Sequence, residues 1–317
     1  MFRALLLLAF AATANAQSYP NKPIRWVVPY TGGGITDVVT RIVTQKMSGP
    51  LGQAVVVDNR PGANSILGSD LAAKAAPDGY TMLTVIAGYA ANVTLYQGKL
   101  PFDPLKDLVP VSLAGIAPLI MTVNNNLPAK DVRELIAYAK ANPGKLNFGS
   151  SGIGAAAHLT CELFKQTAGI DMVHIPFKGT APATQAVIAN DIQILVDTPS
   201  SMMPQVRGGK LRALGMFSGK RLQAFPDVPT IGEAGGPPLE SSTWVLFMAP
   251  GGTPKAVIDR LAAETGKAIN ESEIKDRFIQ LGIEPVGNSP DEAKRFLDAE
   301  ITKWARVINT AGVKAEQ

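Results

Sequence analysis

The stretch from Ile24 to Val43 constrains the fold of this chain more than any other. An apolar run, Ile24 to Val28, predicts a buried strand, and three glycines follow it at Gly32, Gly33 and Gly34. Apolar residues then recur at the spacing of one helix face: Ile35, Val38, Val39, Ile42 and Val43. The sequence therefore predicts strand, glycine loop and helix. The free N–H groups at the start of such a helix suit an anion, such as a carboxylate, sulfate or phosphate.

The same alternation continues along the chain and predicts parallel sheets covered by helices on both faces. Further strands are expected at 54–57, 82–86, 119–123, 145–148, 173–175, 192–196, 211–216 and 244–248. Further helices are expected at 66–76, 131–141, 155–167, 183–189, 253–269, 271–281 and 290–308. We expect the first helix to stop at Gly49-Pro50, and the long helix near 253 to begin with Thr253 as its N-cap and Pro254 as its first residue.

A second loop rich in glycine and serine, Gly149 to Gly154, also stands between a predicted strand and a predicted helix. Two such half-sites, one on each lobe, could close on one small anion. The fold class that follows is α/β, of the type II periplasmic binding protein architecture, with two lobes that each hold a central β-sheet flanked by helices and a ligand cleft between them. We place residues 17–120 and 247–317 in the first domain and 121–246 in the second, with hinge strands near 119–123 and 244–248.

The N-terminal residues predict export. Arg3 precedes an apolar stretch at 4–12, and Ala14-Asn15-Ala16 is a cleavage signature, so we expect a leader cut near Ala16 and a periplasmic product. The only cysteine, Cys161, sits in a helical pattern and is expected to be a buried small hydrophobe. The formal charge is +4, but Lys and Arg are scattered without a basic run, which argues against nucleic acid.

Enzyme and cofactor interpretations are weaker. A dinucleotide fingerprint would need glycines at 32, 34 and 37, yet position 37 is Asp37, so Asp58 at the end of the second strand is not expected to bind a ribose. Gly149 to Ile153 resembles a nucleophile elbow but lacks its last glycine, and no histidine follows Asp197 as a hydrolase triad requires. No His, Cys, Asp or Glu residues have metal-ligand spacing. We expect no cofactor, no metal and no catalysis.

Several side chains have two interpretations. Asp37 and Asp197 either hold their loops in shape or accept hydrogen bonds from a ligand or a bridging water. His174 is expected to be a structural strand residue, and His158 either contacts the ligand or orients the second loop. Thr180 either caps the helix that it begins or turns its hydroxyl to the ligand.

Six stretches, in order, resemble the substrate-binding proteins of tripartite tricarboxylate transporters, also called Bug-type proteins. They are 28–37 (VPYTGGGITD), 58–63 (DNRPGA), 75–80 (AAPDGY), 143–152 (PGKLNFGSSG), 173–179 (VHIPFKG) and 225–230 (FPDVPT). The resemblance covers about 19–315. It implies a monomeric periplasmic receptor that captures a small organic carboxylate and delivers it to membrane transporter subunits.

The resemblance also implies which residues hold the ligand. In the family a ligand carboxylate is held by backbone groups and waters near the first glycine loop, while loops of the second domain contact the rest. The corresponding first-lobe positions are Tyr30, Thr31, Gly33, Gly34 and Asp37, with Tyr89 just beyond the third strand. The opposing set is Ser150, Ser151, Thr180 and Asp197.

This chain departs from the family pattern at cleft positions. It has Val85 and Ile86 where relatives often have small hydroxyl residues, alanines at 155–157, and Asp197-Thr198 in place of a frequent Asp-Asn. We therefore expect a ligand with an apolar or aromatic body and few carboxylates, rather than citrate. Two other roles stay open: presentation of a ligand to a membrane sensor kinase, and a secreted enzyme acting on a small anion.

Overall fold

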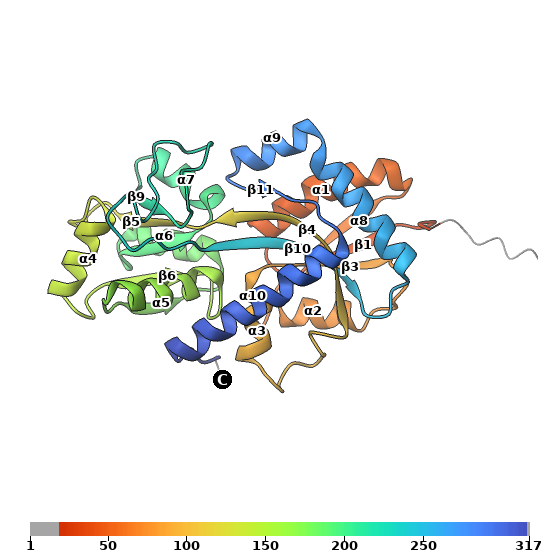
Figure 1. Cartoon of the computed structure of the whole chain (residues 1–317), viewed down its shortest axis with the longest axis horizontal. Helices are drawn as coiled ribbons and strands as arrows, with labels where there is room; N and C mark the ends of the chain where they lie inside the picture. The colour runs from red at the N-terminus through yellow and green to blue at the C-terminus, as the bar shows by residue number, and fades with distance from the viewer. Residues whose placement is uncertain (1–18, 316–317) are drawn as a thin grey trace, which may run out of the picture.

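The chain forms two α/β lobes, each built around one β-sheet (Figure 1). The computed structural model describes residues 19–315. The first sheet has strand order β11-β4-β10-β3-β1-β2, and the second has the order β7-β6-β8-β5-β9. The first-sheet strands are β1 (Ile24–Val28), β2 (Val55–Asn59), β3 (Thr81–Val85), β4 (Leu108–Pro118), β10 (Ser242–Pro250) and β11 (Glu284–Pro285). The second-sheet strands are β5 (Ile120–Asn124), β6 (Asn147–Ser150), β7 (Val173–Pro176), β8 (Ile194–Asp197) and β9 (Leu211–Met216).

Helices cover both sheets. Those of the first lobe are α1 (Ile35–Leu51), α2 (Ile66–Ala73), α3 (Ala87–Leu95), α8 (Lys255–Asn270) and α9 (Ser272–Gln280). Those of the second lobe are α4 (Val132–Ala141), α5 (Ala156–Ala168), α6 (Thr180–Ala189) and α7 (Pro199–Arg207). The last helix, α10 (Pro290–Ala311), crosses from one lobe to the other and packs against α3, β4 and α5 (Figure 1).

The sheets are mixed, which corrects the expectation of parallel sheets. Only β2-β1-β3 and β7-β6-β8 are parallel, whereas β10 is antiparallel to β3 and β4, and β5 is antiparallel to β8 and β9. The physical reason lies in the connections between lobes. The chain leaves the first sheet along β4 and returns along β10, so these neighbours run in opposite directions.

The two connections lie side by side at Leu119 and Ser241. Leu119 donates its N–H to the carbonyl of Ser241 at 3.1 Å, and Phe217 donates to the carbonyl of Leu119 at 2.8 Å. The hydroxyls of Ser241 and Thr160 are 2.6 Å apart. The second connection therefore lies a few residues before the predicted 244–248, because β10 already belongs to the first sheet at Ser242. The domain bounds and the hinge motion stay predictions.

Four elements have no counterpart in the sequence prediction: α3, β4, α7 and the two-residue strand β11. In α3, residues 87–92 are all buried, so no polar face marks the helical period. The predicted stop of α1 at Gly49-Pro50 is wrong, because α1 continues to Leu51 and ends at Gly52, whose φ is 66°. The start of α8 also differs: Pro254 is the N-cap, and Thr253 donates its hydroxyl to the carbonyl of Pro250 at 2.7 Å.

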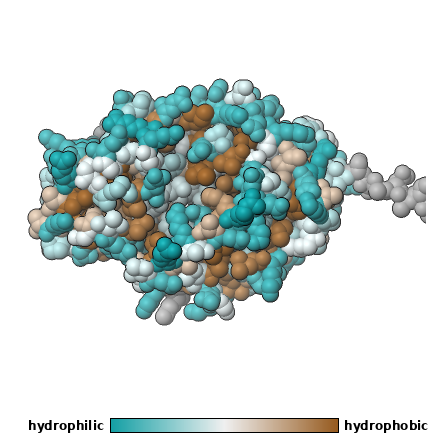
Figure 2. Space-filling model, viewed as in Figure 1, coloured by the Kyte–Doolittle hydropathy of each residue, from teal (hydrophilic) through white to brown (hydrophobic). Residues whose placement is uncertain are grey.

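The core contains three fully buried tryptophans with paired indole N–H groups. Trp26 donates to the hydroxyl of Thr84 at 2.9 Å, while Trp244 and Trp304 both donate to Glu300 Oε2, at 2.8 and 2.9 Å. The carboxylate of Glu300 thus joins α10 to β10 beside the lobe junction. Cys161 is buried, as predicted. Figure 2 shows a mostly hydrophilic face with hydrophobic residues gathered toward its middle and lower part.

Candidate ligand-binding site

The predicted site loops lie at the carboxyl edges of the parallel parts of the two sheets. In the first lobe β1, β2 and β3 end together, and α1, α2 and α3 begin after them. In the second lobe β6, β7 and β8 end together, before α5, α6 and α7. Open α/β sheets bind ligands at this edge, where helix N-termini present unpaired N–H groups.

Asp37 holds the first glycine loop in shape. Its Oδ2 accepts the N–H of Gly33 at 3.0 Å, and its Oδ1 accepts from Arg41 Nε at 2.9 Å and from Asn59 Nδ2 at 3.0 Å. Burial raises the pKa of Asp37, but these three hydrogen bonds outweigh burial and keep that pKa below its ordinary value. Gly33 has φ 85°, a conformation that favours glycine. The loop is therefore fixed by a side chain of the helix that it precedes.

Tyr30 directly precedes this loop, and its hydroxyl lies near Ser65, before α2, and near Gly88 in α3. Burial raises the pKa of Tyr30 to about 12, and the nearby Ser65 side chain offsets a part of this shift. A methyl group built on Gly88, in the first turn of α3, would lie 3.8 Å from the Tyr30 hydroxyl. Thr31 and Gly33 are exposed, and Gly34 is half-buried. The start of α3 therefore joins the first half-site, although the sequence analysis did not identify it.

Tyr89 lies inside the first lobe. Its side chain is 2% exposed, and its hydroxyl donates to the carbonyl of Pro104 at 2.7 Å. Burial raises the pKa of Tyr89 above its ordinary range. This placement favours a packing role for Tyr89 over the predicted ligand contact.

Ser150 is fully buried and braces the second loop. Its hydroxyl donates to the carbonyl of Gly152 at 2.9 Å, accepts the N–H of Gly152 at 3.2 Å, and lies 2.7 Å from His174 Nε2. Ser151 next to it is half-buried. The backbone of this loop includes Gly152 with φ 143° and Gly154 with φ 78°.

Two stacked histidines, His158 and His174, form hydrogen bonds with the same loop. His158 Nδ1 accepts the N–H of Gly154 at 3.1 Å, so that nitrogen carries no proton. The rings of His158 and His174 are 3.7 Å apart and nearly parallel, with Phe148 stacked beyond His174. Burial lowers the pKa of His158 to about 3 and that of His174 to about 4, and the nearby Lys165 charge adds to both shifts. Both histidines therefore position the loop.

Asp197 occupies the end of β8 and is 8% exposed. Its Oδ2 accepts the hydroxyl of Thr180 at 2.8 Å, and its Oδ1 accepts the N–H of Thr198 at 2.7 Å. Burial raises the pKa of Asp197, and these hydrogen bonds offset only part of the effect. The first residue of α6, Thr180, is thereby tied to the loop that precedes α7.

The loops of the two lobes meet. Asn64, in the turn between β2 and α2, donates its Nδ2 to the carbonyl of Ile153 in the second loop at 3.1 Å. On a separate contact between the lobes, a methyl group built on Gly282 would lie 3.0 Å from Pro199 at the start of α7. The turn before α2, at the same edge of the sheet as the first glycine loop, therefore contacts the second loop.

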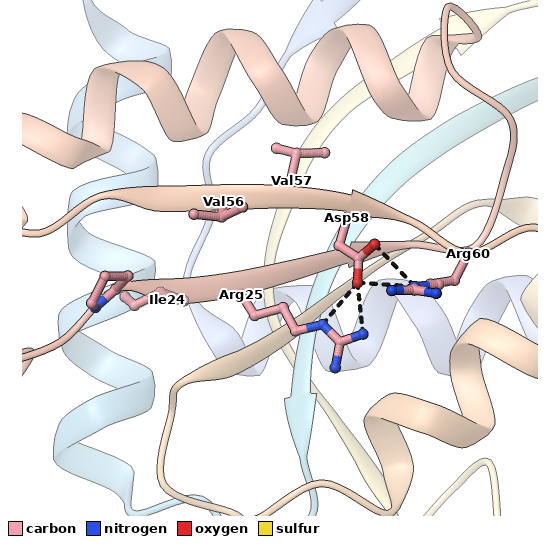
Figure 3. A pocket seen from close by; sticks show the side chains of 7 residues that line it. Ile24, Arg25, Val56, Val57, Asp58 and Arg60 are labelled. Atoms are coloured by element: carbon pink, nitrogen blue, oxygen red, sulfur yellow. Dashed lines mark hydrogen bonds and ion pairs between the residues drawn. The ribbon is translucent and has the colours of Figure 1, made fainter.

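A surface hollow of about 320 Å³ lies elsewhere, against β1 and the edge strand β2 (Figure 3). Arg25 Nε and Nη2 donate to Asp58 Oδ2 at 2.8 and 2.6 Å, and Arg60 Nε donates to the same oxygen at 3.0 Å. Asp58 is thus occupied by two guanidinium groups, which leaves the dinucleotide interpretation without support here.

Within residues 19–315, no cluster of three or more His, Cys, Asp or Glu side chains could hold a metal ion. Over the same residues, no helix combines the length and the apolar composition needed to cross a bilayer. The predicted leader and its cleavage at Ala16 lie outside the described residues.

The two lobes and the facing loops between them define a receptor of the periplasmic binding protein fold. Residues 39–313 match the family described as the tripartite tricarboxylate transporter family receptor. The chain belongs to this family, which confirms the resemblance found in the sequence.

Relatives and solved structures agree with this assignment. The chain is 37% identical to BugT of Bordetella pertussis over 306 residues, which cover 96% of this chain and 94% of BugT. R. palustris Rpa4515, solved with adipate, matches with a TM-score of 0.89 and 32% identity over 93% of this chain and 99% of its own. MatC (Rpa3494) from Rhodopseudomonas palustris, solved with malate, matches with a TM-score of 0.83 and 32% identity over 92% and 100%.

Proposed function

We propose that this protein captures a small organic carboxylate between its lobes and delivers it unchanged to membrane transporter subunits. The observation that carries this proposal is the meeting of the two sets of loops, tied by the hydrogen bond from Asn64 to Ile153 at 3.1 Å. Helix starts from both lobes face one space, and unpaired N–H groups there favour an anion. Binding shifts the population toward the closed form, because only that form lets both lobes engage one ligand.

The side chains already engaged within the protein indicate which groups are left for the ligand. Hydrogen bonds within the loops already engage the side chains of Asp37, Ser150 and Asp197. The carboxylate is then held by backbone N–H groups at the starts of α1 and α3, around Thr31 to Gly34, with the Tyr30 hydroxyl beside them. Ser151, the start of α5 and Thr180 contact the remainder of the ligand.

The ligand class follows from the charges at these loops. Arg41 is bound to Asp37, and Lys178 is exposed. Asp197 places a buried carboxyl without an adjacent cation in the second half-site, as far as the described residues show. The second half-site therefore has little positive charge to offset the cost of burying a second or third ligand carboxylate. The proposed ligand has one or two carboxylates and an apolar body, as adipate does.

A thermal-shift series with adipate, malate, citrate, benzoate and hexanoate tests the ligand class. We expect adipate, benzoate or hexanoate to raise the melting temperature more than citrate does. A shift with citrate that exceeds all the others would overturn the ligand class. Mass spectrometry of the acid that co-purifies then identifies the natural ligand and shows whether the protein returns it unaltered, whereas a product would indicate an enzyme.

Location and partners are part of the same proposal. The predicted leader and the family membership support a periplasmic monomer that serves a tripartite transporter. Loss of uptake of the identified acid in a deletion strain, with rescue by the intact gene, would support this role. Normal uptake together with a lost transcriptional response would indicate a sensory role.

A further inference from the structure

Asn64 makes a contact between the lobes that ligand binding alone does not explain. Its Nδ2 donates to the carbonyl of Ile153 at 3.1 Å and to Asn92 Oδ1 at 2.7 Å, and Asn92 Nδ2 donates back to the carbonyl of Asn64 at 2.8 Å. Asn92 lies on α3, so the reciprocal pair lies within the first lobe. The bond to Ile153 is the one that bridges to the second lobe.

The backbone at Asn64 presents this side chain in an uncommon conformation. Ala63, Asn64 and Ser65 have φ values of 45°, 50° and 71°, so three successive residues that are not glycine are left-handed. A left-handed conformation at residues other than glycine is strained, and it persists only where surrounding contacts enforce it. The hydrogen bonds with Asn92 stabilise this backbone conformation within the first lobe, and they keep the Asn64 amide directed toward the second lobe.

The acceptor belongs to the loop that the proposed function assigns to the ligand. Ile153 lies between Gly152 and Gly154, and a methyl group built on Gly154 would lie 3.8 Å from Ala91 and 3.7 Å from Asn64 Nδ2. The face of α3 and the Asn64 turn therefore receive the second loop directly. A glycine at 154 permits this close approach.

We propose that Asn64 is a positioning residue: its hydrogen bond to the carbonyl of Ile153 is a latch that holds the second lobe over the ligand. Asn92 holds the Asn64 side chain in the orientation that this bond requires. The latch acts on the equilibrium between open and closed forms and makes no contact with the ligand. It rests on the proposed function, since it assumes that the lobes open and close around a ligand. The latch carbonyl of Ile153 and the proposed ligand contact Ser151 share one loop, so closure brings both to the first lobe together.

Two variants separate the latch from the conformation of the turn. Asn64→Gly keeps the left-handed backbone and removes the amide, while Asn64→Asp keeps the size and sets an oxygen against the carbonyl of Ile153. Asn190→Gly is the matched control, because Asn190 is also left-handed, with φ 68°, but ends α6. Asn92→Ala tests the orienting partner.

The measurement is the distance distribution between spin labels on cysteines introduced at Lys74 and Lys140, one on each lobe and both exposed. Native Cys161 is buried and does not compete for the label. We expect both Asn64 variants to shift the protein without added ligand toward longer distances, Asn92→Ala to shift it less, and Asn190→Gly to leave it unchanged. Distributions of both Asn64 variants that match the unsubstituted protein would overturn the latch.

A kinetic measurement complements the distances. For adipate, we expect the Asn64 variants to dissociate about 3- to 10-fold faster with little change in association, which is the range that one lost hydrogen bond gives. A dissociation rate that matches that of the unsubstituted protein would overturn the latch. If adipate does not bind at all, the proposed ligand class fails, while the distances without ligand still decide the latch.

Discussion

The carboxylate of Asp37 accepts the backbone N–H of Gly33, with Oδ2 and the nitrogen 3.0 Å apart. One residue of the first helix thus closes the glycine loop that precedes that helix. Arg41 and Asn59 share the same carboxylate, so the loop, the helix and the end of β2 form one unit. The first glycine loop is therefore held in place by side chains of its own lobe.

Replacing Asp37 should weaken ligand binding through the shape of the loop. Asp37→Asn removes the charge and one acceptor, and Asp37→Ala removes both acceptors. We expect Kd for adipate to rise at least about tenfold and the free energy of unfolding to fall by about 1–3 kcal/mol, because the loop loses hydrogen bonds to a charged carboxylate. Asp259→Asn, at an exposed pair with Lys255, is the control and should change neither quantity appreciably. Calorimetric affinity that stays unchanged in the Asp37 variants would reject this assignment.

The serines of the second loop should differ from each other. Ser150→Ala removes a buried brace of Gly152 and His174, so it should lower stability by about 1–2 kcal/mol as well as affinity. Ser151→Ala should lower affinity alone, because its side chain is half-buried beside the proposed ligand. The double variant should bind at least about tenfold more weakly and still fold. Circular dichroism and calorimetry separate the two effects. Ser218→Ala, in the connector after β9, is the control, and equal losses for Ser150 and Ser151 would contradict the distinction.

Stability should fall as the pH is lowered below about 6.5, the ordinary histidine value. Burial holds the pKa of His158 at about 3 and that of His174 at about 4 in the folded protein, so between pH 4 and 6.5 the unfolded chain binds more protons. The free energy of unfolding then rises with pH across that window, by up to about 1.4 kcal/mol per pH unit for each histidine.

Urea unfolding from pH 4.5 to 7.5 measures this dependence. Because the chain has two histidines, His158→Asn with His174→Asn should flatten the slope, and each single variant should remove part of it. A slope that survives in the double variant would show that groups other than the histidines dominate the acid sensitivity.

Glu300 should be needed to hold α10 against the junction. Its Oε2 accepts both Trp244 and Trp304 indole N–H groups, so Glu300→Leu leaves two buried donors unpaired and should cost about 2–4 kcal/mol. Glu300→Gln retains an acceptor oxygen and should cost less. Thermal and urea unfolding measure both, and Asp298→Asn at the exposed pair with Lys294 serves as the control. A Leu variant as stable as the control would show that packing, and not this carboxylate, secures α10.

Much of the architecture was predictable because it depends on local patterns. The strands at 24–28 and 211–216 match their predicted bounds, and the two glycine loops lie where the strand-to-helix transitions placed them. The apolar runs and the turn residues carry this information themselves. The sheet directions were predicted only in part. The sequence of β4 has no regular apolar pattern, and β4 is antiparallel to β10 because the chain returns along β10 beside it.

What the sequence alone determined is the class of protein, the strand–loop–helix units and the residue types available at each loop. The tertiary structure decided where those side chains point: Asp37, Ser150 and Asp197 toward their own loops, Tyr89 into the core, and Asn64 across to Ile153. Local periodicity records which face of an element is buried. The partner of a polar side chain 89 residues away depends on how whole lobes pack, and no local pattern contains that information.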